Sequence, residues 1–159
     1  MIIFLNGSLN SGKTTVAHLL EKKIEKTAVV EIDELRNFIA WMPIEEAVPI
    51  NLENALSVMR NFLKRDLNII VSYPLSQKNY DYFMENLKEL NEKIFVFTLS
   101  PRLEVILSKR GERKIDDWDI KRIKYHYEMG LHKPSFGVII DNSKQTPEET
   151  VNIILDYIK

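Results

Sequence analysis

Residues 7–14 read Gly-Ser-Leu-Asn-Ser-Gly-Lys-Thr and fit the spacing G-x-x-x-x-G-K-[ST]. An apolar run at residues 2–5 precedes them, and an amphipathic segment begins at Lys13. A strand, a glycine-bearing loop and a helix in this order are the context in which the spacing forms a phosphate-binding loop. The alternative, an ordinary turn with a surface lysine, does not require this strand and helix. We therefore name residues 7–14 the phosphate loop.

Each residue type in the phosphate loop has a physical role. Gly7 and Gly12 allow a tight turn, so that successive backbone N–H groups and the positive end of the next helix surround a β-phosphate. Lys13 is expected to reach the β- and γ-phosphates, and the Thr14 hydroxyl is expected to bind Mg²⁺. The predicted nucleotide-binding residues here are Gly7, Ser8, Leu9, Asn10, Ser11, Gly12, Lys13, Thr14 and Thr15.

Composition limits the class of protein. The 159 residues, 45% apolar and 28% charged, suit one globular domain over residues 1–159. A net charge of −1 does not favour nonspecific nucleic-acid binding, and the lack of cysteine excludes disulfides and thiolate metal sites. No basic leader precedes the first strand, and no apolar run nears the roughly 20 residues that span a bilayer. We therefore expect a cytoplasmic protein without a membrane partner.

Short apolar runs alternate with segments of helical spacing, which is typical of βα units in a parallel sheet. Helical spacing is clear around residues 52–63 and 80–90, and Thr146-Pro147-Glu148-Glu149 predicts a capping box that opens a last helix. The apolar stripes of these helices are expected in the core. The predicted strands lie near residues 2–6, 28–32, 68–73, 93–98 and 136–140.

Two segments interrupt the alternation. Residues 35–50 contain Trp41 and two prolines and predict a short helix at best, and residues 109–117 are a charged run between helices. If the strands are parallel, both segments lie at the carboxyl side of the sheet, where such sheets bind ligands. We interpret the first as an acceptor-binding region and the second as a lid, although a charged run is often only a solvated connection.

The second predicted strand runs into Glu31-Ile32-Asp33-Glu34-Leu35-Arg36. Alternation along a strand would send Glu31 and Asp33 to one side. Beside the phosphate loop, one carboxylate can accept a proton from an attacking hydroxyl, and another can hold Mg²⁺ through water. Arg36, one helical turn after Asp33, can bind an anionic group. The alternative is a set of solvated charges at a helix N-terminus, but we prefer catalysis for Asp33.

These features together resemble the small P-loop kinases that phosphorylate hydroxyl groups, such as shikimate, gluconate and nucleoside-monophosphate kinases and chloramphenicol phosphotransferase. The features that carry this resemblance are the phosphate loop, Glu-x-Asp after strand two, the arginine-bearing lid and Asp141-Asn142-Ser143 after the last strand. Residues 1–14 and Phe97-Thr98-Leu99 resemble the tunicamycin-resistance protein family in particular. Asp33-Glu-Leu-Arg36 also resembles the D-x-x-R of polynucleotide 5′-hydroxyl kinases.

The resemblance implies a three-layer α/β sandwich around a five-stranded parallel sheet in the order 2-3-1-4-5, with ATP and Mg²⁺ as cofactors. Asn142 is expected near the adenine edge, and Thr14 with Glu31 at the metal. Acceptor contacts are expected from Asp33, Arg36 and Trp41. The catalytic residues that it implies are Lys13, Asp33 and the lid residues Arg110 and Arg113.

The chain departs from shikimate kinases at two places, since Glu31-Ile32-Asp33 replaces Asp-x-Asp and Ser72-Tyr73-Pro74 replaces three glycines. No acidic residue ends strand three. We therefore expect an ATP-dependent phosphotransferase that acts on a hydroxyl of a small molecule other than shikimate. The alternatives are a polynucleotide or nucleotide kinase and an ATP-binding resistance protein that sequesters its ligand without turnover.

Other charged residues are assigned no site. Lys121, Arg122 and Lys124 are expected at the surface of a helix. His18, His126 and His132 show no ligand spacing, which argues against a zinc site.

Overall fold

The computed structural model describes residues 1–108 and 114–159. Its centre is a five-stranded sheet in the order β2-β3-β1-β4-β5, and every neighbouring pair is parallel. The predicted fold class and strand order are therefore confirmed. The strands are β1 (Ile2–Asn6), β2 (Thr27–Glu31), β3 (Asn68–Ser72), β4 (Ile94–Leu99) and β5 (Val138–Ile140).

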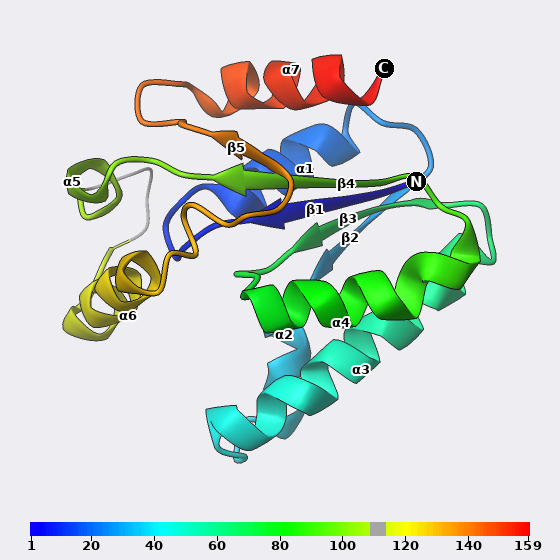
Figure 1. Cartoon of the computed structure of the whole chain (residues 1–159), viewed down its shortest axis with the longest axis horizontal. Helices are drawn as coiled ribbons and strands as arrows, with labels where there is room; N and C mark the ends of the chain where they lie inside the picture. The colour runs from blue at the N-terminus through cyan, green and yellow to red at the C-terminus, as the bar shows by residue number, and fades with distance from the viewer. Residues whose placement is uncertain (109–113) are drawn as a thin grey trace.

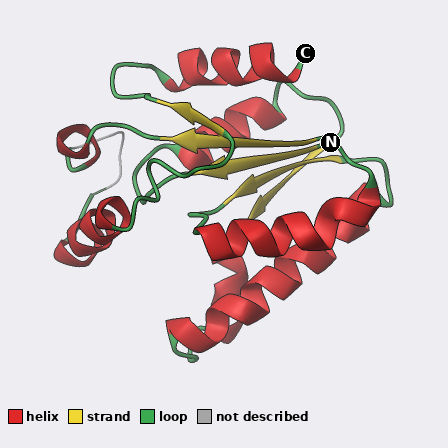
Figure 2. Ribbon diagram, viewed as in Figure 1, coloured by secondary structure: helices red, strands yellow, loops and turns green. Residues whose placement is uncertain are grey.

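Helices cover both faces of the sheet and give three layers (Figure 1, Figure 2). One face carries α1 (Lys13–Glu21) and α7 (Pro147–Ile158), and the other carries α3 (Ile44–Leu63) and α4 (Gln77–Leu87). Two helices lie beyond the strands' carboxyl ends in Figure 1, α5 (Leu103–Ile106) and α6 (Asp117–Glu128). The remaining elements are α2 (Ile32–Leu35) and the 3₁₀ helices η1 (Arg36–Ile39) and η2 (Lys88–Leu90).

The central strand β1 is buried on both faces. Ile2 and Phe4 belong to the core beneath α3 and α4, whereas Ile3 and Leu5 belong to the core beneath α1 and α7. A strand covered on two sides needs apolar residues at every position, which explains the unbroken run in the sequence. Phe4 also packs against Phe83 of α4, with ring centroids 5.2 Å apart.

The segment after β2 differs from the sequence prediction. The strand ends at Glu31, and Asp33 lies in the first turn of α2, so strand alternation is not what brings these carboxylates together. The expectation of at most a short helix in residues 35–50 is also wrong, because α3 begins at Ile44 and continues through Pro49. Pro49 removes one backbone hydrogen bond, but buried residues such as Ala47 and Leu52 keep the helix packed.

Two other local features are clear. Thr146 caps α7 in the predicted capping box, its hydroxyl accepting from the Glu149 amide at 3.2 Å while the Glu149 carboxylate accepts from the Thr146 amide at 2.8 Å. Among the described residues, no helix combines the length and the apolar character needed to cross a membrane.

Asn6, the last residue of β1, fastens three segments at the carboxyl edge of the sheet. Its Nδ2 donates to Thr98 Oγ1 of β4 at 2.9 Å, and its Oδ1 accepts from the Leu75 amide at 2.7 Å. All three groups are buried from water. Because an unpaired buried polar group is costly, this side chain fixes the loops that follow β1, β3 and β4.

We expect Asn6→Ala to lower the free energy of unfolding by about 2 kcal/mol or more, because it leaves the Leu75 amide and the Thr98 hydroxyl without this partner. Thr98→Val is the matched control and should cost less, since Asn6 Nδ2 also lies 3.4 Å from the Leu131 carbonyl oxygen. Urea denaturation measures both changes. Equal losses in the two variants would contradict the role given to Asn6.

Candidate active site

A cleft of about 1350 Å³ opens at the carboxyl ends of the strands. Its walls come from the loops after all five strands and from one side of α6. The phosphate loop with Thr14 lies in its middle, Val105, Asn142 and Ser143 line one part, and Arg36 and Asn51 line another. The cleft is therefore the place where the sequence predicted nucleotide and acceptor to meet.

The shape of the phosphate loop depends on its first glycine. Gly7 has a φ of +140°, and a Cβ at this position would lie 2.6 Å from the Leu99 carbonyl oxygen and 2.7 Å from Ser11 Oγ. No side chain fits in that space. Gly12, with a φ of +97°, then caps α1. The loop therefore wraps closely over the end of β4 and directs the N-terminus of α1 toward the cleft.

Hydrogen bonds with segments later in the chain hold the phosphate loop in place. Asn10 Nδ2 donates to the Ile106 carbonyl oxygen of α5 at 2.7 Å, and Asn142 Nδ2 donates to the Ser11 carbonyl oxygen at 2.9 Å. Asn142 was predicted near the adenine edge. It lines the cleft, is buried, and contacts the loop backbone directly.

Lys13 and Thr14 start α1 at the floor of the cleft. The Lys13 side chain is only 9% exposed, and its Nζ donates to the Ser8 carbonyl oxygen at 2.8 Å. A largely buried ammonium near a turn of backbone N–H groups attracts a phosphate strongly. Thr14 Oγ1 donates to Glu31 Oε2 at 2.7 Å, which brings together the two predicted metal-binding residues.

The oxygen donors of Thr14 and Glu31 fit Mg²⁺, which keeps most of its ligands as water and phosphate oxygens. Within residues 1–108 and 114–159, no cluster of three or more His, Asp or Glu forms a cage that would suit a different metal. His18 Nε2 lies 3.3 Å from Glu31 Oε1, the carboxylate oxygen to which Thr14 does not donate.

Asp33 projects from the first turn of α2 into the cleft. The surrounding cleft walls limit hydration of its carboxyl and raise the pKa of Asp33 above the ordinary value, although the nearby cations Lys13 and Arg122 oppose the rise. Its charge also acts on Tyr73. Burial first, and then the Asp33 carboxylate, raise the pKa of the Tyr73 phenol to about 12.

Helix α6 contributes an unforeseen wall. Trp118, Arg122, Tyr125 and Met129 follow one another at helical spacing, and all four line the cleft. The Arg122 guanidinium lies 5.5 Å from the centroid of the Tyr125 ring. Arg122 was expected at the surface of a helix. It is partly exposed and lines the cleft, a position that the sequence of an isolated helix does not reveal.

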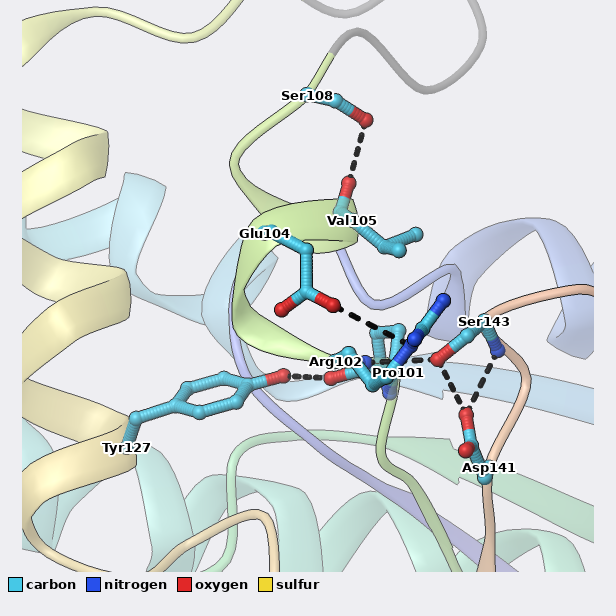
Figure 3. A network of polar contacts seen from close by, with 8 residues as sticks. All are labelled: Pro101, Arg102, Glu104, Val105, Ser108, Tyr127, Asp141 and Ser143. Atoms are coloured by element: carbon cyan, nitrogen blue, oxygen red, sulfur yellow. Dashed lines mark hydrogen bonds and ion pairs between the residues drawn. The ribbon is translucent and has the colours of Figure 1, made fainter.

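The loops after β4 and β5 are tied together at one end of the cleft (Figure 3). Ser143 Oγ accepts from the Arg102 amide at 2.8 Å and donates to Asp141 Oδ1. Hydrogen bonds from Ser143 hold the pKa of Asp141 below its ordinary value. The Tyr127 hydroxyl of α6 donates to the Pro101 carbonyl oxygen in the same cluster. The loop that carries Asn142 is thus fixed relative to α6.

The opposite end of the cleft contains unused polar groups. Arg36 Nε and Asn51 Oδ1 are buried, line the cleft and have no hydrogen-bond partner among the described residues. Trp41 was expected to line this pocket, but it is 80% exposed and lies outside the cleft lining. Trp41 lies in the turn between the end of η1 at Ile39 and the start of α3 at Ile44, where no other element covers its side chain. Of the predicted lid, Arg110 and Arg113 lie outside the described residues.

Comparison with known proteins identifies the family. The chain is 30% identical over 165 residues to a protein of Sulfurisphaera tokodaii named "Putative adenylate kinase", and the match covers 98% of this chain and 81% of that protein. The chain belongs to the P-loop kinases, as that relative does. No protein-family model matches it.

Solved structures of other P-loop kinases share its fold. The tunicamycin resistance protein of Deinococcus radiodurans superposes with a TM-score of 0.73 at 20% identity, over 99% of this chain and 94% of that one. A sugar kinase from Janibacter sp. HTCC2649 gives a TM-score of 0.74 at 20% identity, over 99% and 93% of the two chains. The sequence resemblance to small P-loop kinases is therefore confirmed.

In this P-loop kinase, Lys13→Ala should preserve the fold and lower ATP turnover by on the order of 10² or more, because the buried ammonium no longer balances phosphate charge. Lys22→Ala is the control, since Lys22 is an exposed lysine at the other end of α1. Circular dichroism, ATP binding and ADP release are the measurements. Equal ATP affinity and equal turnover in Lys13→Ala and in the unmodified protein would refute the assignment of the phosphate loop.

Proposed function

We propose that this P-loop kinase transfers the γ-phosphoryl group of ATP to a hydroxyl of a small molecule, with Asp33 as the general base. Support comes from one arrangement above all. The Asp33 carboxyl lines the same cleft as Lys13, Arg36 and Asn51, it is close enough to Lys13 for the two charges to interact, and its pKa is raised. A base at the junction of donor and acceptor, with a pKa moved toward neutrality, suits the deprotonation of an alcohol.

The proposed reaction follows from these positions. The phosphate-loop N–H groups and Lys13 hold the β- and γ-phosphates, and bound Mg²⁺, held by Thr14 and Glu31, supplies neutralising charge. The acceptor oxygen bonds to the γ-phosphorus as its proton passes to Asp33. The bond from the γ-phosphorus to the bridging oxygen breaks, and ADP leaves. Arg122 lies near Asp33 and His126 at the α6 side, where a cation can balance charge on the moving phosphoryl.

The two unpartnered polar atoms in the cleft indicate which chemical groups the acceptor carries. Arg36 Nε is a buried donor, and Asn51 Oδ1 is a buried acceptor. Each needs a partner, because an unsatisfied buried polar atom is costly. We infer that the acceptor supplies an oxygen, carbonyl or anionic, to Arg36 and an N–H or O–H group to Asn51. Such an acceptor carries polar groups besides the hydroxyl that reacts.

A second candidate is a nucleotide kinase, which the relationship to the adenylate kinase-like protein of Sulfurisphaera tokodaii favours. The chemistry of the two candidates differs at one step. A phosphate acceptor is already ionised at neutral pH and gives up no proton, so Asp33 would only position or repel it. A hydroxyl acceptor needs a base. The effect of removing Asp33 therefore separates the two.

For a hydroxyl acceptor, Asp33→Asn should lower kcat by on the order of 10² or more with little change in ATP affinity. The raised pKa gives a second expectation. Only ionised Asp33 accepts a proton, so kcat should fall as the pH drops through a value above the ordinary aspartate range, and this fall should be absent from Asp33→Asn. ADP release is measured across a panel of sugars, amino alcohols, nucleosides and nucleoside monophosphates.

The remaining outcomes distinguish the alternatives. Fast turnover with a nucleoside monophosphate that survives Asp33→Asn would replace the first candidate with the second. Collapse of ATP affinity in Asp33→Asn, with kcat preserved, would assign Asp33 to the metal site. Transfer to an oligonucleotide 5′-hydroxyl, with a salt slope of roughly −0.7 per phosphate contact, would indicate a polynucleotide kinase. ATP binding without consumption on the whole panel would indicate sequestration.

A further inference from the structure

A buried hydrogen bond joins the phosphate loop to α6. The reaction proposed above gives this bond no role. Ser8 Oγ, in the phosphate loop, lies 3.0 Å from His126 Nδ1 of α6. Ser8 is 1% exposed and His126 is 4% exposed, so water does not compete for this contact. The two residues are 118 positions apart in the chain. The bond therefore exists only because the fold packs α6 against the phosphate loop.

The environment keeps the imidazole neutral. Burial, and then the nearby cations Arg122 and Lys13, lower the pKa of His126 to about 4. At neutral pH one ring nitrogen thus carries a proton and the other accepts, and the Ser8 hydroxyl can serve either tautomer. A neutral histidine in this position adds no charge to the phosphate site. Its contribution is a directed bond rather than an electrostatic one.

Ser8 connects this contact to the catalytic groups. Its carbonyl oxygen accepts from Lys13 Nζ at 2.8 Å, while its hydroxyl contacts His126. On α6, Arg122 precedes His126 by one helical turn and lines the cleft. A second contact holds the end of the same helix, since the Leu131 amide donates to the His126 carbonyl oxygen at 3.0 Å. Lys13 and Arg122, the two cations that act on Asp33, are therefore linked through Ser8 and His126.

We propose that His126 is a positioning residue, which through its hydrogen bond to Ser8 fixes α6 against the phosphate loop and thereby holds Arg122 at the transferring phosphoryl group. This inference rests on the proposed phosphoryl transfer. A cation stabilises a transition state best when it is placed before the reaction, because no energy is then spent on moving it. A shift of about 1 Å in such a group can cost a large part of its effect.

The test compares two complexes that need no acceptor, ADP·Mg²⁺ alone and ADP·Mg²⁺ with aluminium fluoride, a mimic of the transferring phosphoryl group. Isothermal titration calorimetry gives the factor by which aluminium fluoride tightens binding, and this ratio cancels any loss of ADP affinity itself. We expect His126→Leu and Ser8→Ala each to reduce the factor by roughly tenfold, and Arg122→Ala to do the same. His126→Asn, whose amide can still bond to Ser8, should restore most of it.

Two further variants test whether His126 acts through Arg122. In the double variant of His126→Leu and Arg122→Ala, the factor should equal that of Arg122→Ala alone, because the two residues form one unit. Thr27→Val is the matched control. It removes a half-buried hydrogen bond at the start of β2, to the Ile24 carbonyl oxygen, which belongs neither to α6 nor to the cleft lining, and it should lower the melting temperature without changing the factor.

Three results would overturn the inference. An unchanged factor in His126→Leu and Ser8→Ala, with a lower melting temperature, would make the contact purely structural. Additive losses in the double variant would show that His126 acts independently of Arg122. Lack of any tightening by aluminium fluoride in the unmodified protein, although ADP binds, would show that Arg122 is not held ready for the phosphoryl group and would overturn the positioning role, whereas the proposed phosphoryl transfer itself is judged by ADP release across the acceptor panel.

Discussion

The close approach of the phosphate loop to β4 is the contact on which the site depends. A Cβ at Gly7 would lie 2.6 Å from the Leu99 carbonyl oxygen, so only glycine lets the backbone pass there. That passage turns the chain toward the cleft and starts α1 at Lys13. The other walls of the cleft are positioned against this loop, by Asn142 from the loop after β5 and by His126 from α6. Loss of that one approach would separate them.

In the cleft, two cations act on one carboxyl. Lys13 and Arg122 lower the pKa of Asp33, but burial in the cleft raises it by more. A raised pKa makes the ionised carboxylate a stronger proton acceptor than an unperturbed aspartate. Burial, and then the same cations, lower the pKa of His126 to about 4 and keep it neutral. The groups of this cleft thus influence one another's charge state, as is common where proton transfer and phosphate binding occur together.

Sequence reasoning succeeded where a local pattern carried the information. The spacing of apolar residues and the positions of turn residues predicted all five strands to within two residues. The predicted capping box of Thr146 is present. It failed where packing decided the outcome. Pro49 lies inside α3 because buried neighbours offset a lost hydrogen bond. Trp41 is exposed and does not line the cleft although residues on both sides of it in the chain do, and Arg122 lines the cleft although its helix is highly polar.

The sequence by itself determined the phosphate loop, the parallel βα architecture and the family, because spacing within a short segment dictates a backbone shape there. It also indicated Glu31 and Asp33 as neighbours of that loop. Only the tertiary structure decided which side of α6 faces the cleft and that His126 meets Ser8. These choices depend on contacts between residues more than 100 positions apart, such as the 118 that separate Ser8 from His126. No periodicity within either segment encodes such a contact, since it arises from the way separate elements pack.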